Sequence, residues 1–289
     1  MTQASIPVDL FNPGQVFACM GFLEAADILL GKAQGRFEWG PSGNSFILRA
    51  DGDENPVRAV LSFLTNAKVK WLSPRRDLKE RDGGDTEVVL GIAASADPKA
   101  ADLPGVLCGQ YGGVECEVPF GFWADGSGRF AVTFKKSTKG NSSHIRFKNA
   151  LDAIRQMDLL QAEMDPFNQW ARTESLFRLD PRGYVVPIDA GFSPDSLRKG
   201  IKGGLDVRVA TYPLCELLAV IGLQHARPES LDQEHFVYSV WNRWLPPALA
   251  RAAIGGYLRL GPVRRFRVKH VEVKKGGDRI MSYGEEVKE

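Results

Sequence analysis

The sequence is poor in the residues that most often bind metals or form disulfides. Its 289 residues include only four cysteines and four histidines. Cys19, Cys108, Cys116 and Cys215 form no Cys-x-x-Cys pair, and the scattered histidines do not complete a ligand cluster, so we expect no zinc site. The pattern indicates reduced, structural thiols of the kind found in a cytosolic protein.

Motifs of the common enzyme classes are also missing. The sequence contains no H-E-x-x-H, no G-x-S-x-G, no P-loop, no dinucleotide-binding fingerprint and no acidic metal cluster. It has no run of about 18 apolar residues, and residues 1–10 lack the basic start and apolar core of a secretory signal. We therefore expect a cytoplasmic protein without enzymatic activity, cofactor or membrane partner.

The net charge is only +2, but the positive charges are unevenly distributed. They concentrate in a predicted hairpin loop at 129–148, in a glycine loop at 198–204 and in a predicted strand region at 259–279. Clusters of this kind are typical of proteins that bind a polyanion. The cations that we expect to contact phosphates are Lys135, Lys136, Lys139, Arg146, Lys148, Arg198, Lys199, Lys202, Arg264, Arg265, Arg267, Lys269, Lys274 and Lys275.

The segment Arg129–Lys148 combines six Lys or Arg residues with no acidic residue. Alternating apolar residues predict a strand at its start, and a helix pattern resumes at Phe147 and runs to Met164. Between them lies a polar loop with Asn141, Ser142 and Ser143, whose donors would suit phosphate oxygens. The same composition also fits a solvated hairpin tip.

His144 provides the one candidate for catalysis. It lies beside serines and near Lys139 and Arg146. A histidine with cations nearby can act as a general acid when RNA is cleaved by its own 2′-hydroxyl group. A surface position or a phosphate contact is the simpler interpretation, because no partner for His144 can be placed from the sequence.

The first part of the chain, residues 1–74, has the element order β-α-β-β-α-β. Asn12-Pro13 and Asn55-Pro56 each predict a helix start, with asparagine as the N-cap. Gly21 leaves one side of the first helix small enough to pack closely on a sheet, and Val69–Leu72 is expected to be the fourth strand. This order predicts a ferredoxin-like α+β module, whose open face binds RNA in some proteins and serves other functions elsewhere.

The remainder, residues 87–289, is predicted to be a mixed α/β region with β-hairpins that packs on this module. Residues 93–105 read as a connection, and Val114–Phe122 is expected to form a hairpin with Arg129–Phe134. Tyr212–Ile221 and Pro247–Tyr257 are predicted helices, and His235–Trp241 and Leu260–Lys274 are predicted strands.

Two segments resemble a known family. IPVDLFNPGQVFACMGFLEAADILL, from Ile6, and FRLDPRGYVVPIDAGFSPDSLRKGIKGGLDVRVATYPLCELLAVIGL, from Phe177, are similar to a protein encoded in type I-U (I-G) CRISPR loci. The second segment is also similar to part of the longer large-subunit proteins of such loci. The shared motifs are turn and packing signatures.

The resemblance implies a small, large-subunit-like component of the Cascade surveillance complex. Its partners would be the CRISPR guide RNA, target DNA, other Cascade subunits and the helicase-nuclease, and it could help to read the motif that flanks the target. In such complexes the protein reads backbone shape while the guide reads sequence. Two alternatives remain open: a guide-RNA-processing endoribonuclease that uses His144, and a protein-interaction subunit without nucleic-acid contact.

Overall fold

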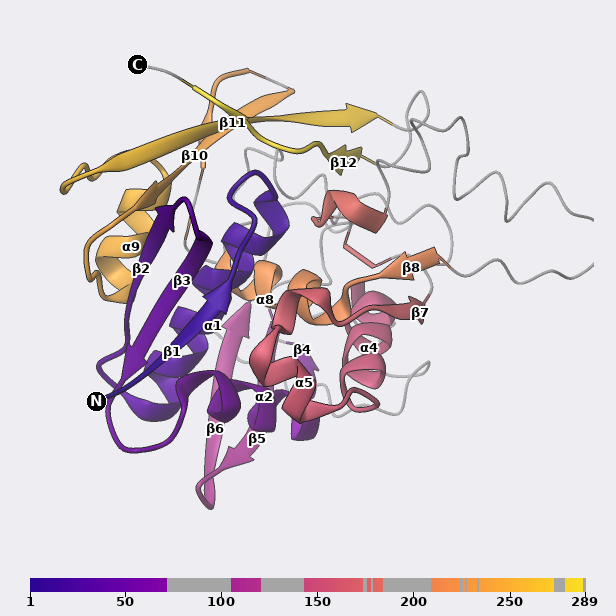
Figure 1. Ribbon diagram of the computed structural model, residues 1–289. Coiled ribbons are helices and arrows are strands. Elements are labelled where there is room, and N and C mark those ends of the chain that lie inside the picture. The colour runs from indigo at the N-terminus through magenta and orange to yellow at the C-terminus, as the bar shows by residue number, and fades with distance from the viewer. Residues whose placement is uncertain are drawn as a thin grey trace, which may run out of the picture.

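The computed structural model describes residues 1–71, 105–120, 143–173, 176–177, 179–183, 209–223, 226, 228–232, 234–272 and 279–287. These residues form a mixed α+β fold with several small antiparallel sheets and, within the described ranges, six α-helices (Figure 1). The predicted fold class is thus confirmed at the level of α+β.

The N-terminal sheet contains β1 (Thr2–Pro7), β2 (Gln34–Gly40) and β3 (Gly43–Ala50) in the order β1-β3-β2. One face is apolar and packs against α1 (Pro13–Leu30) and α2 (Pro56–Asn66). Both helices begin as predicted: Asn12 Oδ1 accepts from the Gln15 amide at 3.3 Å, and Asn55 Oδ1 accepts from the Val57 amide at 2.9 Å. These caps satisfy amides that have no partner within the helix.

The fourth strand of the predicted ferredoxin-like sheet does not join β1. Instead β4 (Lys68–Trp71) pairs with β5 (Gly105–Tyr111), which pairs with β6 (Val114–Phe120) in a separate sheet. The ferredoxin-like order is therefore not confirmed.

The strand from Val114 pairs with β5, a hairpin that the sequence did not predict, and its predicted pairing with 129–134 stays a prediction. Gly112 and Gly113 have φ values of 60° and 81°, the left-handed conformation that a tight two-residue turn requires, so the strand folds back on the residues before it. The segment 129–134 lies outside the described residues.

The single helix predicted from Phe147 to Met164 is in fact two. α4 (Ser143–Ile154) ends before α5 (Leu159–Met164), because the Asp158 side chain caps α5 by accepting from the Leu160 amide at 2.9 Å. The short segments that follow are the 3-10 helix η3 (Pro166–Asn168), β7 (Ala171–Thr173), the 3-10 helix η4 (Pro181–Gly183) and β8 (Val209–Thr211), which pairs with β7.

Helix α8 (Pro213–Gly222) is buried along its whole length and crosses α1 at very short range. A Cβ atom at Gly21 would lie 2.0 Å from the Leu218 carbonyl oxygen, and one at Gly222 would lie 2.0 Å from the Phe17 carbonyl oxygen. The small face of α1 therefore packs on a helix, and not on a sheet as predicted. Only glycine at both positions allows the two backbones to approach so closely.

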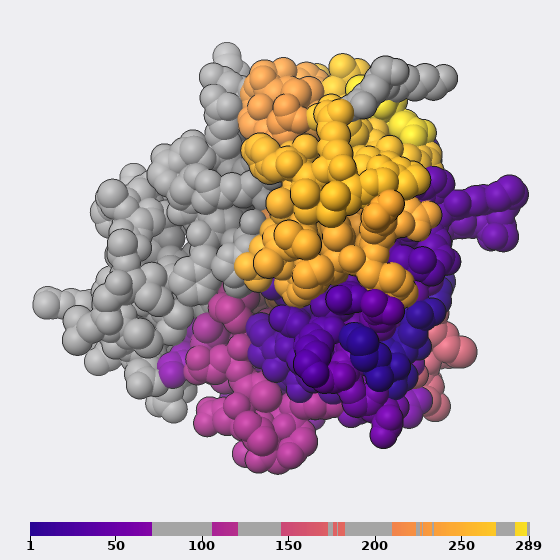
Figure 2. Space-filling model, turned by 90° about the vertical axis from the view of Figure 1, so that its left-hand side faces the viewer, coloured from indigo at the N-terminus to yellow at the C-terminus, as the bar shows by residue number. Residues whose placement is uncertain are grey.

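The C-terminal sheet consists of β9 (Glu229–Ser230), β10 (His235–Trp241), β11 (Val263–Glu272), β12 (Arg279–Met281) and β13 (Glu285–Glu286). Its order is β12-β11-β10-β9, and β13 pairs with β11. Helix α9 (Pro247–Ile254) packs on β10. The gold C-terminal part lies directly above the indigo N-terminal part on the face shown in Figure 2.

The described residues share one hydrophobic core. Buried hydrogen bonds also join distant parts of the chain: the Tyr238 hydroxyl donates to the Leu10 carbonyl at 2.7 Å, and the Trp241 indole donates to the Gly35 carbonyl at 3.1 Å. By length and composition α1 is apolar enough to cross a membrane, yet 78% of it is buried within the protein. Burial of this extent is typical of a core helix.

Candidate nucleic-acid interface

The predicted basic loop at 129–148 is only partly described. Lys135, Lys136, Lys139, Asn141 and Ser142 lie outside the described residues. Ser143 and His144 are the first residues of α4, and the structure does not describe their side chains.

Arg146 and Lys148, the last two predicted cations of this loop, lie on helix α4. Arg146 is only 3% exposed, whereas Lys148 is exposed on the next turn. Arg146 is therefore not the surface cation that we predicted, because the helix begins four residues earlier than expected and turns this side chain inward. The glycine loop with Arg198, Lys199 and Lys202 lies outside the described residues, as do Lys274 and Lys275.

The cations of β11 are described, and the C-terminal strand β13 pairs with two of them. Arg264 donates to Glu286 through two nitrogens, Nε at 2.6 Å and Nη2 at 2.7 Å. Glu286 raises the pKa of Arg264, so the cation stays charged. Arg267 Nη2 lies 3.0 Å from Glu285 Oε2.

Two further cations of β11 lie near carboxylates from β9 and from the residue before β10. Arg265 forms an ion pair with Glu229, and Lys269 Nζ lies 3.5 Å from Glu234 Oε2. Each of the four β11 cations that we expected to contact phosphates therefore lies beside an acidic residue from elsewhere in the chain, and their contact with phosphates stays a prediction. The exposed pairs Arg267–Glu285 and Lys269–Glu234 contribute little stability.

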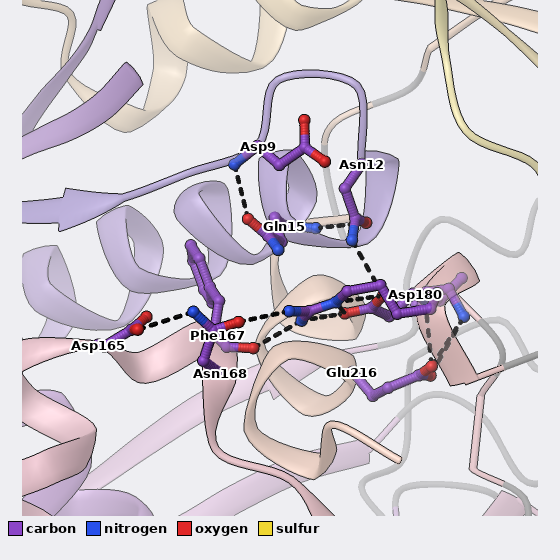
Figure 3. Close-up of polar contacts among 10 residues, drawn as sticks. Asp9, Asn12, Gln15, Asp165, Phe167, Asn168, Asp180 and Glu216 are labelled. Atoms are coloured by element: carbon purple, nitrogen blue, oxygen red, sulfur yellow. Dashed lines mark hydrogen bonds and ion pairs between the residues drawn. The ribbon is translucent and has the colours of Figure 1, made fainter. Parts of the chain in front are cut away.

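A buried polar network connects the start of α1 with the 3-10 helix η4 (Figure 3). Asn12 Nδ2 donates to Asp180 Oδ1 at 2.9 Å, although the two residues lie 168 positions apart. Asp180 also accepts from Arg182, whose Nη1 donates to the Asn168 side-chain oxygen at 2.7 Å. Burial lowers the pKa of Arg182, but Asp180 more than offsets this and raises it. The network fixes the segment 179–183 against α1.

Glu216 on α8 anchors the same segment from the opposite side. Its carboxylate is fully buried and accepts the Leu179 and Asp180 amides at 3.1 Å. Burial and the nearby Asp180 raise the pKa of Glu216 to about 8, against backbone donors that lower it. A lone acidic residue within the apolar segment PLCELLAVIG was the sequence signal for this buried anchor.

Comparison with known proteins provides no relative for this fold. Neither family models, nor curated proteins, nor solved structures match the chain. The described residues contain no group of three or more His, Cys, Asp and Glu residues that could hold a metal ion.

The open face of the N-terminal sheet carries arginine and tryptophan side chains that sequence reasoning missed. The guanidinium carbons of Arg36 and Arg49 lie 4.6 and 4.1 Å from the centroid of the Trp244 ring. Arg49 also donates to the neutral Gln34 at 3.0 Å, and among the described residues no carboxylate forms an ion pair with it. The alternation of Gln34, Arg36 and Glu38 was a signal for this polar face.

Trp244 lies at this face because the next residue, Leu245, pairs with Gly35 at the outer edge of β2. Gly35 and Leu245 exchange two backbone hydrogen bonds, of 2.9 and 3.1 Å, at the outer edge of β2. The segment after β10 is therefore fixed beside β2, and it places Asn242 and Trp244 next to the strand. A hollow of about 680 Å³ lies at the hairpin end of the sheet. Its lining takes Arg36, Glu38 and Ser45 from the open face and Trp39 and Asn44 from the other.

Proposed function

We propose that this protein is a non-catalytic subunit of a type I CRISPR surveillance complex, which acts in the cytoplasm and binds the backbone of the guide RNA or target DNA. Its partners would include other Cascade subunits and the helicase-nuclease. The proposal rests on the similarity of two sequence segments to a type I-U family and on the clustering of positive charge.

The observation that best supports the proposal is the packing between the two similar segments. Helix α1 comes from the first segment and α8 from the second, and they cross at Gly21 and Gly222. The Asn12–Asp180 hydrogen bond joins the same two segments. The residues that carry the resemblance are thus those that hold one folded unit together, as expected if the similarity reflects a common fold.

A finer proposal concerns the N-terminal sheet. The order β1-β3-β2, with both pairings antiparallel, is the order of the first three strands in a ferredoxin-like sheet. We propose that the module derives from that fold and that its fourth strand has been recruited by the hairpin β5–β6.

In this proposal Lys135, Lys136 and Lys139 contact phosphates, and the neighbouring polar loop donates to phosphate oxygens. Phosphate contacts release counterions, so affinity falls as salt rises. Replacing the three lysines with alanine should weaken guide-RNA binding several-fold. It should also flatten the slope of log affinity against log salt by about two to three, at roughly 0.7 to 0.9 per lost contact.

Fluorescence anisotropy with labelled guide RNA at several salt concentrations measures this slope. The control is Lys32→Ala/Lys68→Ala/Arg172→Ala, which removes the same charge from three exposed sites. Equal slopes for both triple variants would contradict the proposal, as would a wild-type protein that does not bind guide RNA. Incubation with a guide precursor tests the enzymatic alternative, since a non-catalytic subunit leaves the RNA uncut.

A further inference from the structure

The hollow on the N-terminal sheet combines features that suit a nucleobase. Its lining includes Trp39, Asn44, Ser45 and Asn242, together with Arg36 and Glu38. Its volume of about 680 Å³ lies within the range of small-molecule sites. Side-chain amides offer a donor and an acceptor that match the edge of a base, and an indole can stack on its face.

The turn between β2 and β3 forms one side of the hollow, and Gly40 and Gly43 belong to its lining. A Cβ atom at Gly40 or Gly43 would have no atom within 4 Å, so space remains around the backbone there. Gly43 has a φ of 119°, which disfavours any residue with a side chain. The tight turn thus allows a ligand to approach the main chain closely.

The edge of β2 supplies further hydrogen-bonding groups. Gly35 directs both its N–H and its C=O outward to Leu245. Trp39 lies four residues further along the same strand, so its N–H and C=O point to the same outer side, beside Asn242. Backbone groups at a strand edge are fixed in direction and suit the Watson–Crick edge of an unpaired base.

The charge of the hollow favours a base and ribose over a phosphate. Arg36 forms an ion pair with Glu38, so the lining is close to neutral. Arg36 Nε is a buried donor without an acceptor in the described part of the chain. The Arg49 guanidinium lies over the Trp244 ring further along the open face. In this position it would neutralise a phosphate next to the bound nucleotide.

We propose that this hollow binds one unpaired nucleotide of a single-stranded nucleic acid, with the base in contact with Trp39 and the two asparagines. The identity of the ligand as nucleic acid rests on the proposed function, but the site is separate from the basic loops. Because the hollow is nearly neutral, its contribution to affinity depends weakly on salt, whereas that of the loops depends strongly on it.

Photo-crosslinking with a pentanucleotide that carries 5-iodouracil locates the bound base. We expect the crosslinked peptide to contain Trp39. Asn242→Ala should lose about ten-fold in crosslinking and in pentanucleotide affinity, because one bidentate contact is worth about 1 to 3 kcal/mol. The control Asn66→Ala removes an exposed asparagine at the end of α2 and should behave as wild type.

The outcomes separate the two proposals. If the lysine triple variant keeps the Trp39 crosslink while losing its salt-dependent affinity, both proposals hold. A Trp39 crosslink in a protein whose guide-RNA affinity does not depend on the three lysines supports the hollow and overturns the loop contacts. Crosslinks elsewhere only, or an Asn242→Ala variant equal to wild type, would overturn the nucleotide site.

Discussion

Glu216 shows how a single buried acid can link the stability of this protein to pH. Its carboxyl group titrates near 4.5 in an unfolded chain and at about 8 in the fold. Between these values the folded state holds a proton that the unfolded state has lost. The free energy of unfolding therefore decreases as the pH rises from about 5 to about 8.

We predict that Glu216→Gln removes this contribution. The variant should lose less stability than wild type between pH 5 and pH 8, because glutamine cannot ionise but still offers a carbonyl oxygen to the Leu179 and Asp180 amides. Urea denaturation at pH 5, 6.5 and 8 measures the difference. Glu115→Gln, at an exposed position of β6, is the control. An unchanged pH dependence in the Glu216 variant would contradict the assignment.

At the residue scale the sequence predicted local interactions better than distant ones. Asn12 and Asn55 were predicted as N-caps, because a cap depends only on the next few residues. The bond from Asn12 to Asp180 could not be predicted, since nothing local to either residue indicates a partner 168 positions away.

Among the elements, the crossing of α1 and α8 leaves no room for a side chain at its two glycines. Gly21→Ala would place a methyl group 2.0 Å from the Leu218 carbonyl oxygen, where backbone must move to make room. We expect a loss of about 3 kcal/mol or more in the free energy of unfolding. Chemical denaturation measures it, and Gly40→Ala, which meets no atom within 4 Å, should change stability little. A stable Gly21→Ala variant would show that the helices lie further apart.

The positions of helices and strands were predicted correctly where a strong apolar pattern marks them. The partners of some strands were not predicted, because strand pairing depends on distant residues. The strand from His235 to Trp241 agrees with the prediction, and so does the buried helix within one residue at each end. The hairpin β5–β6 was missed, although Gly112-Gly113 between alternating residues is a turn signal. The partner of β4 could not be inferred, because an edge strand carries no mark of its neighbour.

At the scale of the whole molecule, the C-terminal acidic residues balance the basic strand β11. Glu285→Gln/Glu286→Gln would leave Arg264 and Arg267 without their carboxylate partners. We predict that the double variant binds heparin or DNA several-fold more tightly at low salt and with a steeper salt dependence, because two more cations can release counterions.

The control for this prediction matches the change in charge. Asp53→Asn/Glu115→Gln removes two exposed acidic residues away from β11, so it separates net charge from local unmasking. Elution from a heparin column and anisotropy with labelled DNA measure both variants. Equal gains in affinity would show that only the total charge matters.

Helices α1 and α8 cross at glycines that lie about 200 residues apart in the chain. During synthesis the first helix leaves the ribosome long before its packing partner has been made, and contacts between such distant segments form slowly. Until then an apolar helix faces solvent, a state in which nascent chains aggregate or bind chaperones. Expression of an N-terminal half alone should therefore yield insoluble protein, and the core of the full chain would close only after its translation is nearly complete.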